Sequence, residues 1–293
     1  MNRFTISQLQ QFSGVKAHTI RIWESRYKAL SPIRSKGNTR YYDNFQLRRL
    51  LNITSLMNSD YKVSELCTMS DQQLFDILQR RLESDKPADE LHGYFVSQLI
   101  IAGMSYDEAH FEKIFATMFL RFGIVNSYIH VLHPLLVRIG LMWANNTMLP
   151  AQEHFISNLI RQKLFSAIDS LPPPKENEQT WLLYLPENEF HELGLLFSHY
   201  LLRYAGKKVI YLGSNVPFDT LNQAVEKIKP SHTLLFLVHN DDPETIEKYL
   251  TELSKKYSKI HFCVSGNLQL VEQLQLPENF KLLRNTDDLL RIL

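Results

Sequence analysis

Cysteine and long apolar runs are scarce in this chain of 293 residues. Its two cysteines, Cys67 and Cys263, are too few for a disulfide framework or a thiolate zinc set, which favours a reducing compartment. No apolar run reaches the roughly 18 residues that a membrane span needs, and the polar residues 1–12 lack the apolar core of a secretion signal. We therefore expect a cytoplasmic protein with no membrane partner. The composition, 44% hydrophobic and 22% charged, excludes collagen-like and disordered chains.

The net charge of +1 conceals an uneven distribution of charge along the chain. Residues 1–72 hold 11 Lys and Arg against 5 Asp and Glu, so this segment carries +6. Residues 73–293 hold 21 basic and 26 acidic residues and carry −5. This asymmetry indicates one part that binds a polyanion and another part with a different task.

Two shifts in composition divide the chain. A polar stretch covers residues 80–90, and a run of three prolines, which no helix continues through, lies in residues 171–178. The sequence therefore predicts a multidomain protein with domains at 1–75, 90–170 and 179–293.

The first domain reads as a winged helix-turn-helix. Apolar residues at helical spacing predict helices over 7–12 and 16–27, and Gly14 separates them. Residues 31–42 place strand-forming residues on both sides of a Lys-Gly-Asn turn, which predicts a small wing. A third helix is expected over residues 45–58.

The second domain reads as a four-helix bundle. Ser105 and Glu108 form a capping-box pattern before a helix that runs to Phe122. Pro134 is expected to kink or split the next helix, and Pro150 suits the first position of the last one. The four predicted helices cover residues 91–104, 106–122, 124–143 and 150–170.

The third domain alternates strands with amphipathic helices, which predicts a doubly wound, Rossmann-like parallel α/β sheet. Such sheets bind ligands at the carboxyl ends of their strands. The predicted strands cover residues 181–185, 208–212, 233–238, 260–264 and 280–283.

Basic residues gather around the second helix and the wing, as phosphate contacts with DNA require. The segment Thr19–Glu24, followed by Arg34–Tyr42, resembles the N-terminal module of MerR-type regulators, with Trp23 and Tyr42 read as core aromatics. The resemblance implies a dimer on a palindromic double-stranded DNA operator, hence a location at the nucleoid. It implies major-groove contacts by Lys16, His18, Thr19 and Arg21, and phosphate contacts by Arg34, Lys36, Arg40 and Tyr41.

The loop after the first predicted strand of the third domain carries a candidate ligand site. His191 stands at a strand carboxyl end, and a neutral imidazole is a good ligand for transition metals, cobalt included. Glu189 can accept the other ring N–H and orient the imidazole. Gly194 would let the following helix approach a large planar ligand closely.

The pattern Glu189-x-His191-x-x-Gly194 resembles the Asp-x-His-x-x-Gly signature of cobalamin-binding domains. The resemblance implies that His191 is the lower axial ligand of cobalt. The segment from Leu212 to Pro217, with Gly213 and Val216 as candidate cofactor contacts, also resembles the family's pattern. Farther on, two positions that line the slot for the nucleotide tail depart from it. Phe236 replaces the serine of Ser-x-Leu, and Gly266-Asn267 replaces a Gly-Gly pair.

A second motif lies in the bundle. Trp143 precedes the pair Glu153-His154 at the Trp-x9-Glu-His spacing of the cobalamin-dependent photoreceptor repressors of the MerR type, which the chain resembles over nearly its whole length. The resemblance implies that these three residues cover the upper face of adenosylcobalamin. It implies a light-responsive repressor in which the bound cofactor controls a dimer or tetramer and DNA binding. His154 would become the upper cobalt ligand after light has broken the cobalt–carbon bond.

Other functions remain open. The third domain could have lost cobalamin binding and serve as an oligomerisation or partner module. An enzyme of cobalamin-dependent methyl transfer is disfavoured, because a DNA-binding module has no role there. The upper ligand, adenosyl or methyl, is not decided by Trp143 alone.

Overall fold

The computed structural model describes residues 3–35, 37–57, 61–83, 91–144, 148–174, 179–238 and 242–293. The chain divides into two compact units, residues 1–157 and 158–293. The division falls inside one helix, α9 (Pro150–Asp169). The predicted bundle, residues 90–170, instead includes the whole of this helix. The three-domain boundaries stay a prediction.

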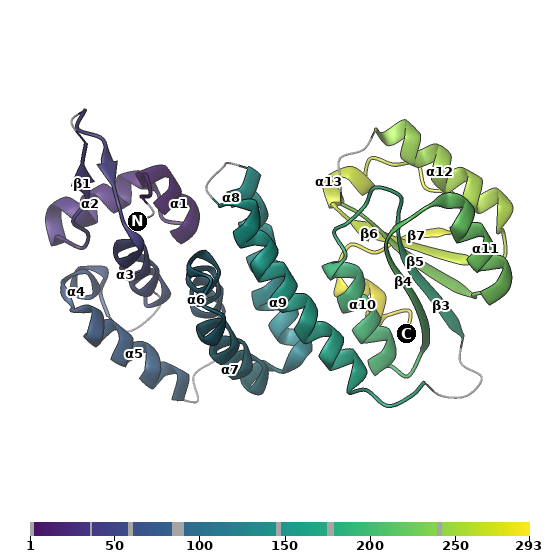
Figure 1. Cartoon of the computed structure of the whole chain (residues 1–293), viewed down its shortest axis with the longest axis horizontal. Coiled ribbons are helices and arrows are strands. Elements are labelled where there is room, and N and C mark those ends of the chain that lie inside the picture. The colour runs from purple at the N-terminus through teal and green to yellow at the C-terminus, as the bar shows by residue number, and fades with distance from the viewer. Residues whose placement is uncertain are drawn as a thin grey trace. The chain divides into compact units, whose positions relative to one another are not determined.

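The first unit is almost wholly helical, and a short hairpin projects from its N-terminal part (Figure 1). Its elements end with the first half of α9. In chain order they are α1 (Ile6–Ser13), α2 (Ala17–Tyr27), β1 (Ile33–Arg34), β2 (Arg40–Tyr41), α3 (Asn44–Ser55), α4 (Val63–Thr68), α5 (Asp71–Glu83), α6 (His92–Ser105), α7 (Glu108–Ser127), the π-helix η2 (Tyr128–Leu132) and α8 (His133–Ala144).

The predicted helix-turn-helix and wing are confirmed. Thr5 caps α1 by accepting a backbone N–H, and Gly14 ends α1 at a left-handed φ of 73°. The wing is the antiparallel pair β1–β2. Glu24 of α2 accepts hydrogen bonds from Nε of Arg40 and from the hydroxyl of Tyr42, each at 3.0 Å. One carboxylate therefore attaches the end of the wing to α2.

The helical region that follows is built around α6, whose residues from Tyr94 to Met104 are all buried. The capping box predicted at Ser105 and Glu108 is wrong. Tyr106 adopts the left-handed conformation that ends α6, and Asp107 then caps α7. The Ser105 hydroxyl instead donates back to a carbonyl of α6. The cap thus moves two residues along the chain because α6 runs on through Ser105.

The interruption expected near Pro134 is the π-helical turn η2, which ends just before α8. Proline has no N–H for the carbonyl of the preceding turn, which favours such a local rearrangement. The segment Glu108–Ala144, which includes η2, is long and apolar enough for a membrane span, and an 18-residue window within it has a mean hydropathy of 1.3. Of that window 39% is buried within the protein, and Gly123 breaks the helix with φ 71° and ψ 171°.

A buried polar contact joins the helix-turn-helix to the bundle within the first unit. Gln98 of α6 donates from Nε2 to Oδ1 of Asn52 in α3 at 3.0 Å, and each residue is 7% exposed. The ring of His110 lies 3.1 Å from Oε1 of Gln98, and burial lowers the pKa of His110. Because buried amides are costly when unpaired, this contact fixes α3 against α6.

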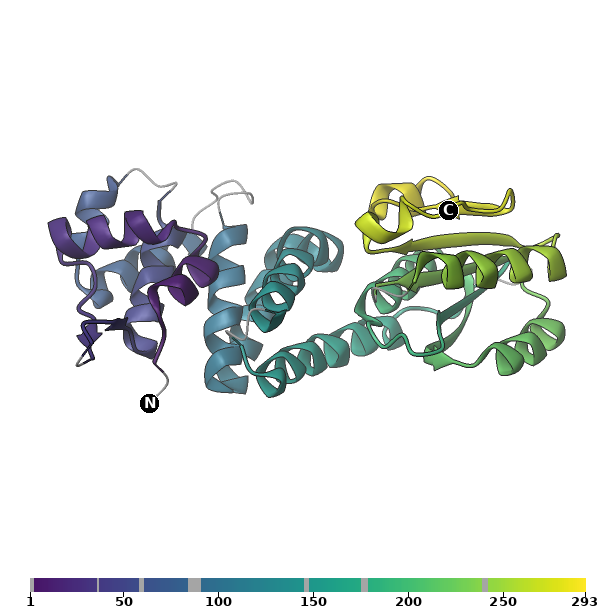
Figure 2. The ribbon, with the colours of Figure 1, turned by 90° about the horizontal axis from the view of Figure 1, so that it is seen from above.

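The second unit is a five-stranded parallel sheet in the order β4-β3-β5-β6-β7 (Figures 1 and 2). The doubly wound fold and all five predicted strands are confirmed, with ends shifted by a few residues. After the second half of α9 the elements are β3 (Thr180–Pro186), α10 (Leu193–Tyr204), β4 (Lys208–Val216), α11 (Phe218–Ile228), β5 (His232–Leu237), α12 (Pro243–Lys256), β6 (His261–Gly266), α13 (Leu268–Val271), β7 (Phe280–Leu282) and α14 (Thr286–Leu290).

The sheet has an apolar core because its central strands are buried on both sides. Leu182 and Tyr184 of β3 and Leu235 of β5 join the apolar residues of α11, α12 and α13 in one cluster. Helix α10 packs on the opposite face of the sheet (Figure 1). The chain leaves β3 toward β4 on one side and returns to β5 on the other. The strand order therefore reverses between β3 and β5, where such folds have their ligand crevice.

Candidate functional site

The residues predicted to contact DNA lie on α2 and on the wing. Lys16 is the residue before the first turn of α2, and Arg34 belongs to β1. Lys36 lies outside the described residues. The exposed members of the set are Lys16, His18, Arg21 and Arg34, and the half-buried members are Thr19, Arg40 and Tyr41.

Arg40 differs from the other predicted phosphate contacts because Glu24 holds its guanidinium. The ion pair at 3.0 Å raises the pKa of Arg40 above its ordinary value. Trp23 is 5% exposed and Tyr42 is fully buried, so both are core aromatics as expected. Arg40 thus helps to position the wing, and its contact with DNA stays a prediction.

The loop after β3 is organised by Glu189, which is 4% exposed. Its Oε1 accepts the backbone N–H groups of Phe190 and His191, both at 2.9 Å. The same oxygen lies 2.7 Å from Nδ1 of His191. Its Oε2 accepts the N–H of Val238 at 2.9 Å. Because Val238 directly follows β5, one carboxylate bridges the carboxyl ends of β3 and β5 at the crevice.

His191 stands at this edge with a side chain that is 58% exposed. With the proton on Nδ1 facing Glu189, the lone pair of the imidazole lies on Nε2, the nitrogen suited to a metal. The part of the chain that the structure describes holds no group of three or more His, Cys, Asp or Glu that could bind a metal ion. The exposed imidazole of His191, oriented by Glu189, has the chemistry of one nitrogen ligand to a transition metal such as cobalt.

The last residues of β4 are tied to the loop after β3. The N–H of Asn215 donates to the carbonyl of Glu189 at 3.0 Å, and Oδ1 of Asn215 accepts the N–H of Asn188 at 2.9 Å. Gly213 has a φ of 79°, which suits glycine, and Val216 is 9% exposed. The predicted residues Gly213 and Val216 thus lie beside the Glu189 loop.

Gly266, at the end of β6, is required by the backbone itself. Its φ is 135°, and a Cβ there would lie 2.1 Å from the carbonyl oxygen of Leu237. The next residue, Asn267, donates its N–H to the same carbonyl. The close approach of the two chains explains this glycine without a ligand, and its role in binding stays a prediction.

Gly194 is covered by a side chain of the same protein. A Cβ at Gly194 would lie 2.6 Å from Cε1 of Phe236, so the ring packs directly on the glycine. Phe236 is the residue that replaces the serine of the cobalamin-domain pattern. The ring of Phe236 therefore occupies the space beside Gly194, and a ligand that reached Gly194 would have to displace the ring.

A network that sequence reasoning missed joins α9 to the sheet within the second unit. Glu192, next to His191, accepts from Nε of Arg161 in α9 at 2.6 Å and from the hydroxyl of Tyr211 in β4 at 3.1 Å. Burial and Glu192 raise the pKa of Tyr211, and burial lowers the pKa of His199, stacked on Tyr211, to about 4. Arg161 and Tyr211 lie 31 and 19 residues from Glu192 in the sequence, so these contacts form no local pattern.

The bundle motif lies in the first unit. Trp143, near the end of α8, is 52% exposed and is therefore not a core residue. Glu153 and His154 lie in the first turn of α9, and Nδ1 of His154 is 2.7 Å from Oε2 of Glu153. The ring of His154 is 71% exposed. Both an indole and an imidazole are thus presented at the surface of this unit.

Comparison with known proteins defines the class of the chain. Residues 4–73 match the MerR HTH family of regulatory proteins, and residues 95–166 match a B12 binding domain. The second match falls on helices α6–α9 and not on the sheet. The chain thus combines a MerR-type DNA-binding module with a B12-binding domain, as its motifs imply.

The chain is homologous to two transcriptional repressors of Myxococcus xanthus. It is 27% identical to the HTH-type transcriptional repressor CarH over 85% of this chain and 84% of that protein. It is also 27% identical to the repressor CarA over 89% of this chain and 85% of that protein. Both relatives are named as transcriptional repressors.

The fold is shared with a solved cobalamin protein. The monomethylamine corrinoid protein of Methanosarcina barkeri superposes with a TM-score of 0.53, at 12% identity, over 68% of this chain and 96% of that one. This likeness concerns the fold alone. With the family matches it confirms the predicted class of a DNA-binding module followed by a helical region and a Rossmann-like cobalamin-binding fold.

Replacement of Glu189 by alanine is expected to loosen the carboxyl ends of β3 and β5, because the N–H of Val238 loses its acceptor. Hydrogen exchange measured on the peptide that contains Val238 should accelerate, and the free energy of unfolding should fall by about 2–4 kcal/mol. The control is Glu187→Ala, in the same loop but exposed. Equal exchange in the two variants would contradict the bridging role of Glu189.

Proposed function

We propose that this protein is a light-responsive transcriptional repressor that uses adenosylcobalamin, or its methyl analogue, to control its oligomeric state. The observation that carries the proposal is the Glu189–His191 pair at the point where the strand order reverses. Homology to repressors and the B12-binding match support the coarser statement of a cobalamin-binding regulator. The proposal goes beyond this statement in the light response and in the control of the oligomeric state.

In this proposal the residues divide the work by chemistry. His191 would bind cobalt through Nε2, while Glu189 keeps the proton on Nδ1 and holds the ring in place. Trp143 offers an exposed aromatic surface for the adenosyl group. Glu153 and His154 contact the upper face, where His154 can supply an imidazole nitrogen in the light state. When bound, adenosylcobalamin supplies a cobalt–carbon bond that visible light breaks.

The DNA-binding step follows from charge. The exposed Lys16 and Arg21 enter the major groove, the exposed Arg34 neutralises phosphates, and the wing that Glu24 fixes to α2 sets the register of these contacts. A dimer or tetramer carries several DNA-binding modules, and linked modules raise avidity for a palindromic operator. Loss of the oligomer in the light would therefore release DNA in the nucleoid.

One observation favours a second function. Phe236 covers Gly194, which resembles the glycine at the cobalamin site of related domains. If the ring never moves, the sheet domain serves as an oligomerisation or partner module without cobalamin. Equilibrium dialysis with adenosylcobalamin separates the two functions, because the second predicts no binding even at high micromolar ligand.

His191→Ala is expected to weaken adenosylcobalamin binding by at least the roughly 10- to 100-fold that loss of an outer partner of a metal ligand costs. A titration followed by the visible absorption of the cofactor measures this, and the spectrum of any complex that remains should show that its lower ligand has changed. The matched control is His261→Ala, an exposed histidine at the opposite end of the sheet, where β6 begins. Equal affinity and an unchanged spectrum in His191→Ala would refute the lower-ligand assignment.

Phe236→Ser is expected to strengthen adenosylcobalamin binding by about twofold to tenfold, since a ligand at Gly194 no longer has to displace and reorder a ring. The same titration measures it. Tyr204→Ser, an exposed aromatic at the far end of α10, should leave the affinity unchanged. Weaker binding by Phe236→Ser would show that the ring supports the site.

Illumination of the full chain with adenosylcobalamin is expected to change both its absorption spectrum and its size on gel filtration, from an oligomer in the dark to a smaller species. Trp143→Ala should reduce the dark oligomer, because the adenosyl group loses its aromatic contact. Leu120→Ala, with an apolar side chain that is 90% exposed on α7, is the control. The same elution volume in dark and light would rule out the proposed switch.

A further inference from the structure

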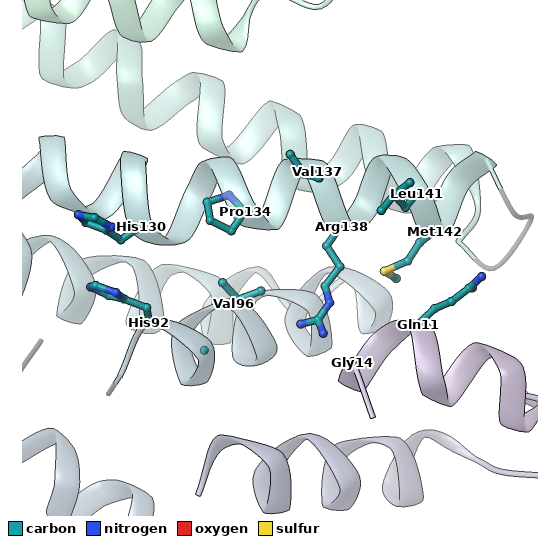
Figure 3. A pocket seen from close by; sticks show the side chains of 11 residues that line it. Gln11, Gly14, His92, Val96, His130, Pro134, Val137, Arg138, Leu141 and Met142 are labelled. Carbon is teal, nitrogen blue, oxygen red and sulfur yellow. The ribbon is translucent and has the colours of Figure 1, made fainter. Parts of the chain in front are cut away.

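A pocket of about 680 Å³ opens in the first unit, lined by α1, α6, η2 and α8 (Figure 3). Its walls are mostly apolar and include Val96, Val137, Leu141 and Met142. The volume falls within the range of about 300–1,000 Å³ typical of small-molecule sites. None of the residues assigned above to cobalamin or DNA lines it, so the proposed function leaves this pocket unexplained.

A single arginine enters the apolar pocket. Arg138 extends from α8 toward Gly14 at the end of α1, and a Cβ on Gly14 would lie 3.0 Å from Nη2 of Arg138 (Figure 3). Burial lowers the pKa of Arg138 from its ordinary value, although a guanidinium stays charged at neutral pH. Within residues 3–35, 37–57, 61–83 and 91–144, no carboxylate or other acceptor pairs with it. A desolvated cation without a counterion is costly, and an anion would relieve that cost.

Two further features define the pocket. Oε1 of Gln11, on α1, is buried and has no hydrogen-bond partner among the described residues. At the other end the rings of His92 and His130 are stacked, with centroids 4.8 Å apart and planes 4° from parallel. The pocket thus offers a cation and an amide toward α1, apolar side chains between, and a flat aromatic wall on α6 and η2 (Figure 3).

We propose that this pocket binds an amphipathic organic anion, a carboxylate on a hydrocarbon or aromatic body, with the carboxylate on Arg138. The guanidinium fork suits a carboxylate in a bidentate contact. The apolar walls select against a small inorganic anion, which would leave them in contact with water. The amide of Gln11 can donate a hydrogen bond from Nε2 to the same head group, because a carboxylate only accepts. Such a ligand touches α1 of the DNA-binding module and α8 of the bundle at once.

The test uses octanoate and 1-octanol, which share a chain length and differ in charge, titrated calorimetrically into the full chain. We expect octanoate to bind and 1-octanol to bind at least about tenfold more weakly, the factor expected from loss of one charge-assisted contact. In Arg138→Gln the affinity for octanoate should fall at least about tenfold, with little change for 1-octanol. The matched control is Arg80→Gln, an exposed arginine of α5, which should bind like the parent chain.

A second variant guards against misfolding of Arg138→Gln. Gly93 of α6 lines the pocket, and a Cβ there meets nothing within 4 Å, so Gly93→Leu fits the helix and fills the space. It should abolish octanoate binding and leave the far-ultraviolet circular dichroism unchanged. The proposal would be overturned if the parent chain did not bind octanoate, or if it bound inorganic phosphate as strongly. It would also be overturned if Arg138→Gln and Gly93→Leu bound octanoate as tightly as the parent chain.

Discussion

The buried carboxylate of Glu189 is the contact on which the proposed cobalt site depends. A carboxylate at 4% exposure is stable only when donors surround it, and four do. Three of these donors belong to its own loop, and the fourth, the N–H of Val238, belongs to the end of β5. The orientation of the His191 imidazole is therefore coupled to the packing of β5 beside β3. The imidazole ring of His191 is therefore held in position before a cofactor binds.

Two other glutamates also join separate elements of the fold through their carboxylates. Glu24 holds the end of the wing on α2 through Arg40 and Tyr42, and Glu192 holds α9 on β4 through Arg161 and Tyr211. In each case one acidic side chain joins two elements that are distant in sequence. Through Arg161, the Glu192 contact ties the residue directly after His191 to α9 within the second unit.

Residue patterns in the sequence predicted those parts of the structure that depend on residues close together in the chain. Alternating apolar segments predicted all five strands, and the Glu-x-His spacing predicted the contact between Glu189 and the ring of His191, which is only two residues away. The capping box at Ser105 failed because the end of α6 depends on where its buried face stops, not on the cap residues alone. Phe236 was recognised as a departure from a pattern, but its position on Gly194, 42 residues away in the chain, was not predicted.

The sequence by itself determined the elements, their order and the chemical groups at the strand ends, because helix and strand periodicity and short-range hydrogen bonds act over a few residues. It also separated a basic DNA-binding segment from an acidic remainder, because charge is counted along the chain. Only the tertiary structure decided which of those groups meet. The bridge from Glu189 to Val238, the ring of Phe236 on Gly194 and the unpaired Arg138 above Gly14 arise from packing between distant segments, where each side chain takes the place that its neighbours leave.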